Sequence, residues 1–324
     1  MRAEDATQAQ PAKSAARRGL GVVWLLFAAL CAAFTAGQVG AWHWLFDLCA
    51  HFRVQYAYAA ALFLGLFVVY RDLRGVLAVV VLAVFLLPGL FRLAWRMEHD
   101  PSAEARTPLR VLLANVHTSN RAHEVLVEAV QREEPDIVVL QETDEAWIAG
   151  IEPLMASYPH RIVEPRADNF GMTLLARMPL ETAECRFIAG PLPTLVARFV
   201  HEAKTWTVFA THALPPRRRN GTARRDQQLI EVAQLAREAG ERCVVVGDFN
   251  TTPWSHIFER MLEVGDLVDS AKGFGVQPTW PMRLPGILRI PLDHCLCSRD
   301  VLVKQRRLVG AIGSDHMPVF FELR

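Results

Sequence analysis

A short polar motif follows directly after an apolar run, and its side chains are suited to acid–base or metal chemistry. The run at 243–246 is predicted to be a buried strand, and the motif GDFN occupies residues 247–250. Alternation along an extended chain can place the Asp248 carboxylate and the Asn250 carboxamide on the same side. The motif alone also fits an ordinary turn, because Asp and Asn are frequent turn residues.

Other polar residues lie at the ends of further predicted strands. Together with the GDFN motif they favour an active site over an ordinary turn. They are Asn115, Glu142, His212, Asp293, His294, Asp315 and His316. Because the apolar middles of strands form a core, their polar ends can gather in one cleft. Asp315 and His316 are neighbours whose side chains point in different directions, so we expect a His–Asp pair to form across strands instead.

The side chains in this set favour hydrolysis of a phosphate ester with a divalent metal. Oxygen ligands such as that of Glu142 suit Mg²⁺ or Mn²⁺ better than Zn²⁺. A hard cation that keeps several waters, together with a carboxylate and histidines, can direct water at phosphorus and offset charge on the phosphoryl oxygens. The sequence has no serine in a nucleophile elbow and no Gly-rich loop before a helix that would cradle a nucleotide.

The elements that must position these residues alternate between strands and helices from Leu109 onward. Apolar runs predict strands at 110–115, 137–140, 172–176, 195–200, 206–210, 243–246, 293–297, 301–305 and 319–323. Helical spacing of apolar residues and turn signals predict helices at 121–132, 146–157, 224–239 and 254–263. This order predicts an α/β domain that carries the polar residues at its strand ends.

The first hundred residues hold most of the excess apolar content, which is 52% over the whole chain. Uncharged runs cover 19–46, 54–70 and 75–91, and each is near the length needed to cross a bilayer. We predict a transmembrane region with three helices. The predicted domains are a cytoplasmic tail at 1–18, the transmembrane region at 19–93, a linker at 94–108 and a catalytic domain at 109–324. Burial of three such runs inside a soluble domain is the alternative, and this chain length makes it difficult.

Positive charges favour a multi-pass protein of the inner (plasma) membrane whose catalytic domain lies on the extracytoplasmic side. The supporting residues precede the first run or separate the second from the third, and they are Lys13, Arg17, Arg18, Arg71 and Arg74. Arg92 and Arg96 oppose this orientation. A cleaved signal peptide at the first run is an alternative, and it would leave the catalytic domain on the same side.

The overall charge and the cysteines give little information about function. A net charge of +1 provides no global argument for a nucleic-acid partner, and the six cysteines lack the spacing of a metal site. Cys295 and Cys297 flank one residue of a predicted strand, so they are poorly placed for a mutual disulfide.

The motifs, in this order, resemble those of the endonuclease/exonuclease/phosphatase superfamily, and most closely its bacterial membrane-attached branch. The matching residues are Asn115, Gln141, Glu142, Thr211, His212, Gly247 to Asn250, Leu292 to His294 and Gly313 to His316. The resemblance covers 109–324 and implies a four-layer α/β sandwich, in which two packed mixed β-sheets are flanked by helices. Here the sandwich follows an N-terminal helical transmembrane region.

The resemblance also implies roles for individual residues. The expected metal ligands for Mg²⁺ or Mn²⁺ are Glu142, Asn115 and Asp315. The expected catalytic residues are Asp248, His316, His212, Asn250 and Asp293. The expected substrate contacts are Asn169, Arg224, Arg225 and His294. Which carboxylate acts as the base remains open at this point.

Three functions compete for the substrate. A phosphodiesterase or nuclease could bind nucleic acid through a basic segment after His212 that contains Arg217, Arg218, Arg219, Arg224 and Arg225. A phospholipid-directed phosphodiesterase or phosphatase could use the membrane anchor and the apolar segment 282–290 to contact lipid. A non-catalytic binding module tethered to the membrane is the third possibility, and retention of every polar position argues against it.

Overall fold

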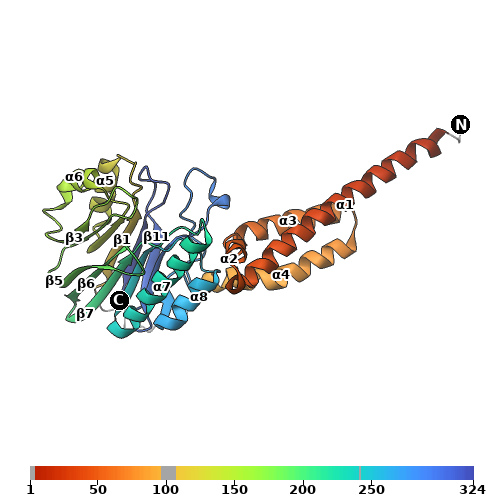
Figure 1. Cartoon of the computed structure of the whole chain (residues 1–324). Helices are drawn as coiled ribbons and strands as arrows, with labels where there is room; N and C mark the ends of the chain where they lie inside the picture. The colour runs from red at the N-terminus through yellow and green to blue at the C-terminus, as the bar shows by residue number, and fades with distance from the viewer. Residues whose placement is uncertain (1–3, 96–106, 241) are drawn as a thin grey trace. The chain divides into compact units, whose positions relative to one another are not determined.

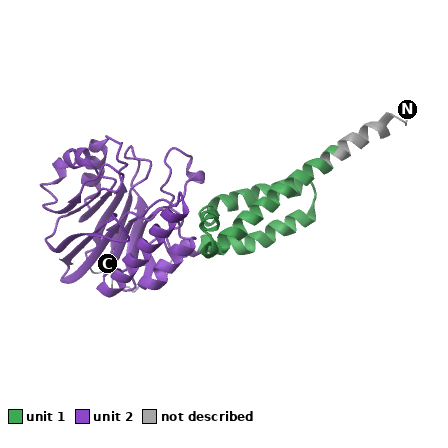
Figure 2. Ribbon diagram, in the orientation of Figure 1, with its two compact units in different colours: residues 1–91 green, residues 92–324 purple. Residues whose placement is uncertain are grey.

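The structure, a computed structural model, describes residues 4–95, 107–240 and 242–324. The chain divides into two compact units, residues 1–91 and residues 92–324, which Figure 2 distinguishes by colour. Most of the predicted linker at 94–108 lies outside the described residues.

The first unit is helical throughout its described part. Its elements, with the last one continuing into the second unit, are α1 (Glu4–Gln38), the 3₁₀ turn η1 (Gly40–Trp42), α2 (Trp44–Ala50), α3 (Arg53–Val69) and α4 (Leu73–Ala94). Aromatic rings hold the helices together, since the ring centroid of Phe27 lies 5.4 Å from that of Phe63 and 5.6 Å from that of Phe67. The Trp24 indole also donates a hydrogen bond to Asp72 Oδ2 at 2.7 Å.

The outward surface of this unit is strongly apolar. Leu25, Val84 and Phe85 are 71%, 63% and 65% exposed. Such a surface is unfavourable in water and is typical of helices that face lipid. By length and composition, residues 17–38 of α1 and the whole of α4 could each cross a membrane. The pair α2 and α3, bent by 64°, makes a third candidate if it counts as one span.

The first uncharged run, 19–46, holds one candidate span and is not helical to its end. α1 ends at Gln38, and the chain turns back through η1 before α2. A Cβ atom on Gly37 would lie 2.9 Å from the backbone nitrogen of Ala50, and one on Gly40 would lie 3.0 Å from the Cα of Asp47. Glycine at these two positions therefore allows α2 to pack closely against the preceding chain.

The second unit contains two six-stranded mixed sheets. The first has the order β11 (Val303–Leu308), β12 (Val319–Leu323), β1 (Leu109–Asn115), β2 (Ile137–Gln141), β4 (Met172–Ala176), β3 (His160–Glu164). The second has the order β5 (Leu180–Phe187), β6 (Pro193–His201), β7 (Lys204–Thr211), β8 (Cys243–Asp248), β10 (Asp293–Ser298), β9 (Leu267–Asp269). The parallel neighbours are β1 with β2 and β7 with β8.

The sheets pack face to face, and helices cover their outer faces (Figure 1). The main apolar core lies between the sheets and includes Val111 of the first and Val246 of the second. The helices on the first sheet are α5 (His123–Glu133) and α6 (Glu145–Gly150). The helices on the second sheet are α7 (Arg219–Ala239) and α8 (His256–Gly265). The predicted four-layer α/β sandwich is therefore confirmed.

Two predicted helices have different bounds in the structure. The helix predicted at 146–157 ends at Gly150 as α6 and is followed by the 3₁₀ turn η3 (Glu152–Leu154). Pro153 explains the break, because proline lacks an N–H and its ring clashes with the preceding turn of an α-helix. α7 begins at Arg219 rather than at residue 224, so part of the basic segment after His212 is helical.

Three strands were not predicted, and all three lie at sheet edges: β3, β5 and β9. β5 shows why, because most of its side chains are exposed or half-buried and its sequence, LETAECRF, lacks an apolar run. An edge strand is covered on fewer sides than a central strand, so it needs less apolar sequence.

Candidate active site

The polar strand ends meet at one edge of the sandwich. Parallel pairing of β1 with β2 sets Asn115 opposite Gln141, directly before Glu142. In the second sheet, antiparallel pairing of β10 with β8 sets Asp293 opposite Asp248. Because parallel strands end at the same edge of a sheet, β7 delivers His212 beside the end of β8.

Gln141 joins the two sheets beneath this edge. Its side chain is fully buried. Its Nε2 donates to the backbone carbonyl of Thr211 at 2.8 Å, and its Oε1 accepts from the backbone N–H of Asp248 at 2.8 Å. One amide from the first sheet therefore fixes the ends of two strands in the second sheet.

Gly247 makes this junction possible. A Cβ atom at this position would lie 1.9 Å from the carbonyl oxygen of Thr211 and 2.7 Å from Nε2 of Gln141. Any other residue would therefore push the strand ends apart, which explains the glycine before Asp248 physically.

An amide links two carboxylates on one side of the site. Nδ2 of Asn115 donates to Glu142 Oε1 at 2.9 Å and to Asp248 Oδ2 at 3.3 Å. The other Glu142 oxygen, Oε2, accepts from the backbone N–H of Thr118 at 3.4 Å. Asn115, Glu142 and Asp248 are all buried, so this side of the site is rich in oxygen and poor in solvent.

Two histidines approach Asp248 from the other side. Nε2 of His212 lies 3.6 Å from Asp248 Oδ2, and Nε2 of His316 lies 3.5 Å from the same oxygen. The second carboxylate oxygen, Oδ1, accepts from the backbone N–H of Asn250 at 2.8 Å. Asp248 is thus the residue that both sides of the site share.

His316 forms its pair with Asp293 across strands, as predicted. Its Nδ1 lies 2.8 Å from Asp293 Oδ2. Its backbone N–H donates to Ser314 Oγ at 3.1 Å, and that hydroxyl donates to the carbonyl oxygen of Asn115 at 2.7 Å. Ser314 therefore ties the loop before β12 to the end of β1.

Burial and charge shift the pKa values of these groups in opposite directions. Burial raises the pKa of Asp248 to about 7, although the charge of His316 opposes the rise. Burial alone would lower the pKa of His316, but the carboxylates of Asp293 and Asp248 raise it to about 10. Burial alone would raise the pKa of Asp293, but the charge of His316 and its hydrogen bond lower it below its ordinary value. Burial lowers the pKa of His212, which is therefore neutral at pH 7.

The buried trio of Asp248, Asp293 and His316 could hold a metal ion, since their ligand atoms lie within 4.8 Å of one another. The raised pKa of His316 keeps a proton on its ring at neutral pH, which makes it a poor ligand there. The oxygens of Glu142 and Asp248, joined by Asn115, fit a hard cation better.

Asn250 and Arg225 form one connected support. The Asn250 side chain is half-buried, and its Nδ2 donates to the carbonyl oxygen of Ala213 at 2.9 Å. Arg225 is fully buried, and its Nη1 donates to the carbonyl oxygen of Asn250 at 3.2 Å while its Nη2 pairs with Asp226 at 2.8 Å. The contacts of Arg225 position the GDFN turn, and its burial leaves it no exposed surface for a substrate.

Two other predicted residues, His294 and Asp315, make their hydrogen bonds outside this cluster. His294 points to the opposite face of β10, where it stacks on Phe249 and its Nε2 contacts the carbonyl oxygen of Thr251 at 2.9 Å. Asp315 Oδ2 accepts from the Trp280 indole at 3.0 Å, and its Oδ1 is buried without a partner among the described residues. Such an orphaned oxygen is compatible with the ligand role predicted for Asp315.

Asn169 and Arg224 are exposed. Asn169 lies in a turn with a φ angle of 67°, directly before Phe170. The Phe170 ring contacts the ring of His212, with centroids 5.1 Å apart.

Two residues that support the site, Phe170 and Gln228, are absent from the sequence prediction. Phe170 covers His212, and nothing in its sequence context marks it. Gln228 of α7 donates to Thr211 Oγ1 at 3.0 Å and to the carbonyl oxygen of His212 at 3.3 Å. Its burial could have been anticipated from its position on the apolar face of the helix, one residue before Leu229.

The sequence model of the Endonuclease/Exonuclease/phosphatase family matches residues 112–316. No curated protein matches the chain in sequence. Among solved structures, an endonuclease/exonuclease/phosphatase family protein from Bacteroides thetaiotaomicron is 19% identical with a TM-score of 0.56, and the match covers 67% of this chain and 98% of that one.

Two further structures have named substrates or products. D. rerio TDP2, solved with a single-strand DNA product, is 18% identical with a TM-score of 0.56, and the match covers 67% of this chain and 99% of that one. Sphingomyelinase C from Streptomyces griseocarneus is 18% identical with a TM-score of 0.51, over 67% and 99% of the two chains. At these identities the likeness establishes the fold. The family match over 112–316 takes in the strand-end residues from Asn115 to His316, and the chain belongs to the Endonuclease/Exonuclease/phosphatase family, whose members are hydrolases of phosphate esters.

Proposed function

We propose that this protein is a membrane-anchored, divalent-metal-dependent phosphodiesterase or nuclease that directs water at phosphorus. One observation carries the proposal: residues far apart in sequence meet at Asp248 in a single buried hydrogen-bonded cluster. Mg²⁺ or Mn²⁺ would be held by Glu142, whose carboxylate Asn115 orients through Nδ2, and would polarise the phosphate and offset its developing charge.

The protein's own groups divide the remaining tasks. Burial raises the pKa of Asp248 toward neutrality, so its carboxylate is a stronger base than an exposed one and can accept a proton from the attacking water. His316 keeps its proton at neutral pH and can donate a hydrogen bond to a phosphoryl oxygen. Asp293 holds the His316 ring in one orientation through Nδ1. Neutral His212 presents its Nε2 on the same side as His316.

The test is a panel of substrates offered to the full-length protein in detergent micelles. Single-stranded DNA, RNA, a phosphatidylcholine and bis(4-nitrophenyl) phosphate would each be incubated with Mg²⁺, with Mn²⁺ or with EDTA. We expect metal-dependent release of product from DNA, RNA or the aryl diester. Turnover in EDTA equal to that in Mg²⁺ would refute metal dependence. The absence of turnover with every substrate would favour the non-catalytic binding module.

A phospholipid-directed hydrolase is the second candidate, and one surface favours it. Leu284, Ile287 and Leu288 are 37%, 56% and 47% exposed in the loop that includes η4 (Gly286–Leu288). This loop joins the site through Asp315, whose backbone carbonyl accepts from the N–H of Met282 at 2.8 Å. Exposed apolar side chains beside a phosphate site would suit a membrane surface. Cleavage of lipid alone in the panel would select this candidate.

We further propose that the catalytic unit lies outside the cytoplasm of an inner (plasma) membrane protein. Lys13, Arg17 and Arg18, which precede the first uncharged run, support this orientation. Arg71 and Arg74, between the second and third runs, also support it, and Arg92 opposes it. Alkaline phosphatase fused after Arg324 is expected to be active in cells, and a fluorescent protein fused at the same point is expected to be dark. Fluorescence with an inactive phosphatase fusion would reverse the orientation.

A further inference from the structure

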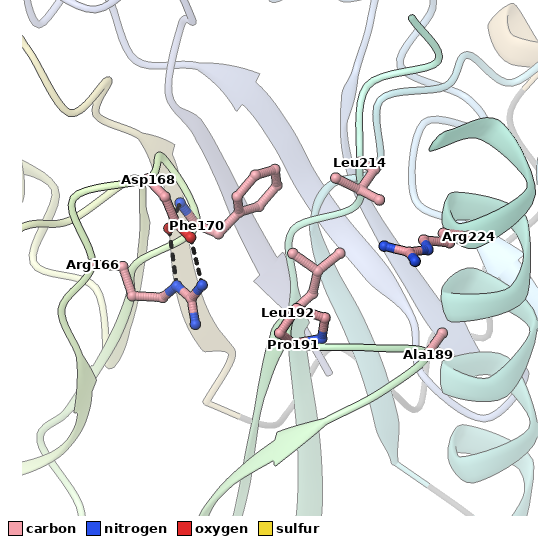
Figure 3. Close-up of a pocket in the computed structure, with 8 residues that line it drawn as sticks. All are labelled: Arg166, Asp168, Phe170, Ala189, Pro191, Leu192, Leu214 and Arg224. Carbon is pink, nitrogen blue, oxygen red and sulfur yellow. Dashed lines mark hydrogen bonds and ion pairs between the residues drawn. The ribbon is translucent and has the colours of Figure 1, made fainter. Parts of the chain in front are cut away.

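A small pocket opens beside the candidate active site, and no step of the proposed hydrolysis uses it. Its volume is about 200 Å³. It lies between the turn after β3, the β5–β6 connection and the first turns of α7, as Figure 3 shows. Its walls include Arg166, Asp168, Phe170, Leu192, Leu214 and Arg224.

The pocket is physically joined to the catalytic cluster through two of its walls. Phe170 lines the pocket and contacts the His212 ring, with centroids 5.1 Å apart. Leu214 follows His212 by two residues and lies on the opposite wall (Figure 3). A group bound in the pocket would therefore lie next to a phosphate held at His212.

The charges around the pocket leave one cation available to a ligand. Arg166 is neutralised by Asp168, through a bond from Nε to Oδ1 at 2.9 Å and a second bond between Nη2 and Oδ2. Arg224 is exposed, and among the described residues no acidic group pairs with its guanidinium. Figure 3 shows its side chain extending from α7 toward Leu214 and Leu192. The other walls are apolar, so the pocket suits an apolar group with an anion at its mouth.

The volume limits the group that can enter. Apolar cavities of about 150 Å³ accept a benzene ring, whereas sites for whole small-molecule ligands occupy about 300 Å³ or more. A pocket of about 200 Å³ therefore fits one ring system and is too small for the paired chains of a phospholipid. The aromatic ring of Phe170 offers a surface for stacking a flat group.

We propose that this pocket binds one nucleobase of a single-stranded nucleic acid next to the scissile phosphate, and that Arg224 binds a neighbouring phosphate. The inference rests on the proposed function and narrows it, because it selects nucleic acid over lipid as the substrate class. Phe170 supplies the stacking surface, Leu192 and Leu214 close the sides, and Arg224 provides the charge that a second phosphate requires.

The inference is tested by comparing the hydrolysis rates of oligonucleotides that differ by a single chemical group. The full-length protein in detergent would be given thymidine oligonucleotides with or without a terminal phosphate, and the same oligonucleotides with a single abasic position moved along the strand. We expect one abasic position to raise KM about tenfold with little change in kcat, because stacking is lost. Leu214→Trp, which fills the pocket, is expected to abolish this dependence on position.

Arg224→Gln tests the phosphate contact by a property that a structural role would not change. The slope of log affinity against log salt should fall by about 0.7, since one phosphate contact on a single strand is lost. Arg237→Gln is the matched control, because this exposed arginine lies on the same helix about 20 Å away at 1.5 Å per residue. It should leave the slope unchanged.

Binding measured without turnover separates this inference from the hydrolase proposal. Affinity for a fluorescent thymidine oligonucleotide would be measured by anisotropy in EDTA. Weaker binding in Leu214→Trp and Arg224→Gln supports the pocket even if no substrate is cleaved, in which case only the hydrolase proposal fails. Unchanged binding in both variants overturns the inference whether or not cleavage occurs. If Leu214→Trp and Arg224→Gln lose as much turnover on a short-chain phosphatidylcholine as on the oligonucleotide, the assignment to a nucleobase is also overturned.

Discussion

Two sets of side chains meet at Oδ2 of Asp248, and they are built from different chemistry. We call Asn115 and Glu142 the oxygen side and His212, His316 and Asp293 the histidine side. On one side the amide of Asn115 joins Asp248 to Glu142, and the groups present oxygen with no cation among the described residues. On the other side His316 carries a proton and is held by Asp293. Asp248 therefore lies between a region that lacks positive charge and a region that already has it.

This difference separates two tasks within one small volume. The oxygen side suits a hard cation, since carboxylates without a cationic partner repel each other when buried. The histidine side can stabilise negative charge and hold protons without a metal. The raised pKa of Asp248 fits its place between them, because burial favours the neutral acid and only His316 opposes that effect strongly. Changes on each side should therefore have different signatures.

The largest effect is expected where the two sides meet. Asp248→Asn should lower turnover by about 10³- to 10⁴-fold, because the proton acceptor for water is lost. His316→Gln should have an effect of similar size through loss of the proton donor. The measurement is the single-turnover rate on the best substrate of the panel, with thermal unfolding as the check on folding. Near wild-type turnover in a protein that carries both changes would remove Asp248 and His316 from the mechanism.

A change on the oxygen side should act through the metal. Glu142→Gln is expected to lower turnover by about 10²-fold and to abolish the rise in Tm that Mg²⁺ or Mn²⁺ gives the wild type, since a ligand that binds only the folded state stabilises it. Glu145→Gln, an exposed acid at the start of α6, is the matched control and should keep both properties. A wild-type metal response in Glu142→Gln would place the cation elsewhere.

A change on the histidine side should act through pH. The pKa of His316 is raised to about 10, so its stabilising pair with Asp293 is complete below pH 6.5 and is lost as the pH rises through about 10. The pKa of Asp293 is lowered, so its contribution is present at neutral pH and is lost only in acid. Asp293→Asn should therefore cost about 3 kcal/mol of stability near pH 7, and the cost should shrink toward pH 10. A cost independent of pH would mean that the pair carries no charge.

Gln141 joins the two sheets beneath the site, so its replacement should change the stability of the fold more than the activity. Gln141→Ala leaves the carbonyl of Thr211 and the N–H of Asp248 without their partner, which should cost about 1–3 kcal/mol. Denaturant unfolding of the full-length protein measures this cost. Gln131→Ala, a change on exposed α5, should alter stability by less than about 0.5 kcal/mol. An equal effect of the two changes would show that Gln141 does not join the sheets energetically.

The smallest effect is expected from changes to exposed arginines that belong to neither the oxygen side nor the histidine side. Arg217, Arg218 and Arg219 are exposed at the start of α7. Their replacement by serine should weaken binding of a polyanionic substrate by a few-fold and reduce the dependence of affinity on salt. The same affinity and the same salt dependence in the triple variant would identify this segment as a solvated surface.

The fold was largely predictable where strands are central. β1, β2, β4, β8 and β12 have continuous apolar runs because they are covered on both faces, and their predicted bounds agree with the structure within a few residues. The edge strands β3, β5 and β9 were missed because partial exposure allows polar sequence. The helix predicted at 146–157 ends at Gly150, because Pro153 cannot continue an α-helix.

The types of the site residues were readable from the chain, since polar side chains recur at the ends of several apolar runs. Their partners were decided only by the tertiary structure. The packing of two sheets determines that Asn115 contacts Asp248, that Gln141 bonds to both strands of the other sheet, and that Phe170 covers His212. Strand alternation sent His294 to the opposite face from Asp293, and helix α7 buried Arg225 while leaving Arg224 exposed. Sequence fixes which groups reach the sheet edge, but burial and distance, which set their charges, exist only after the sheets have packed.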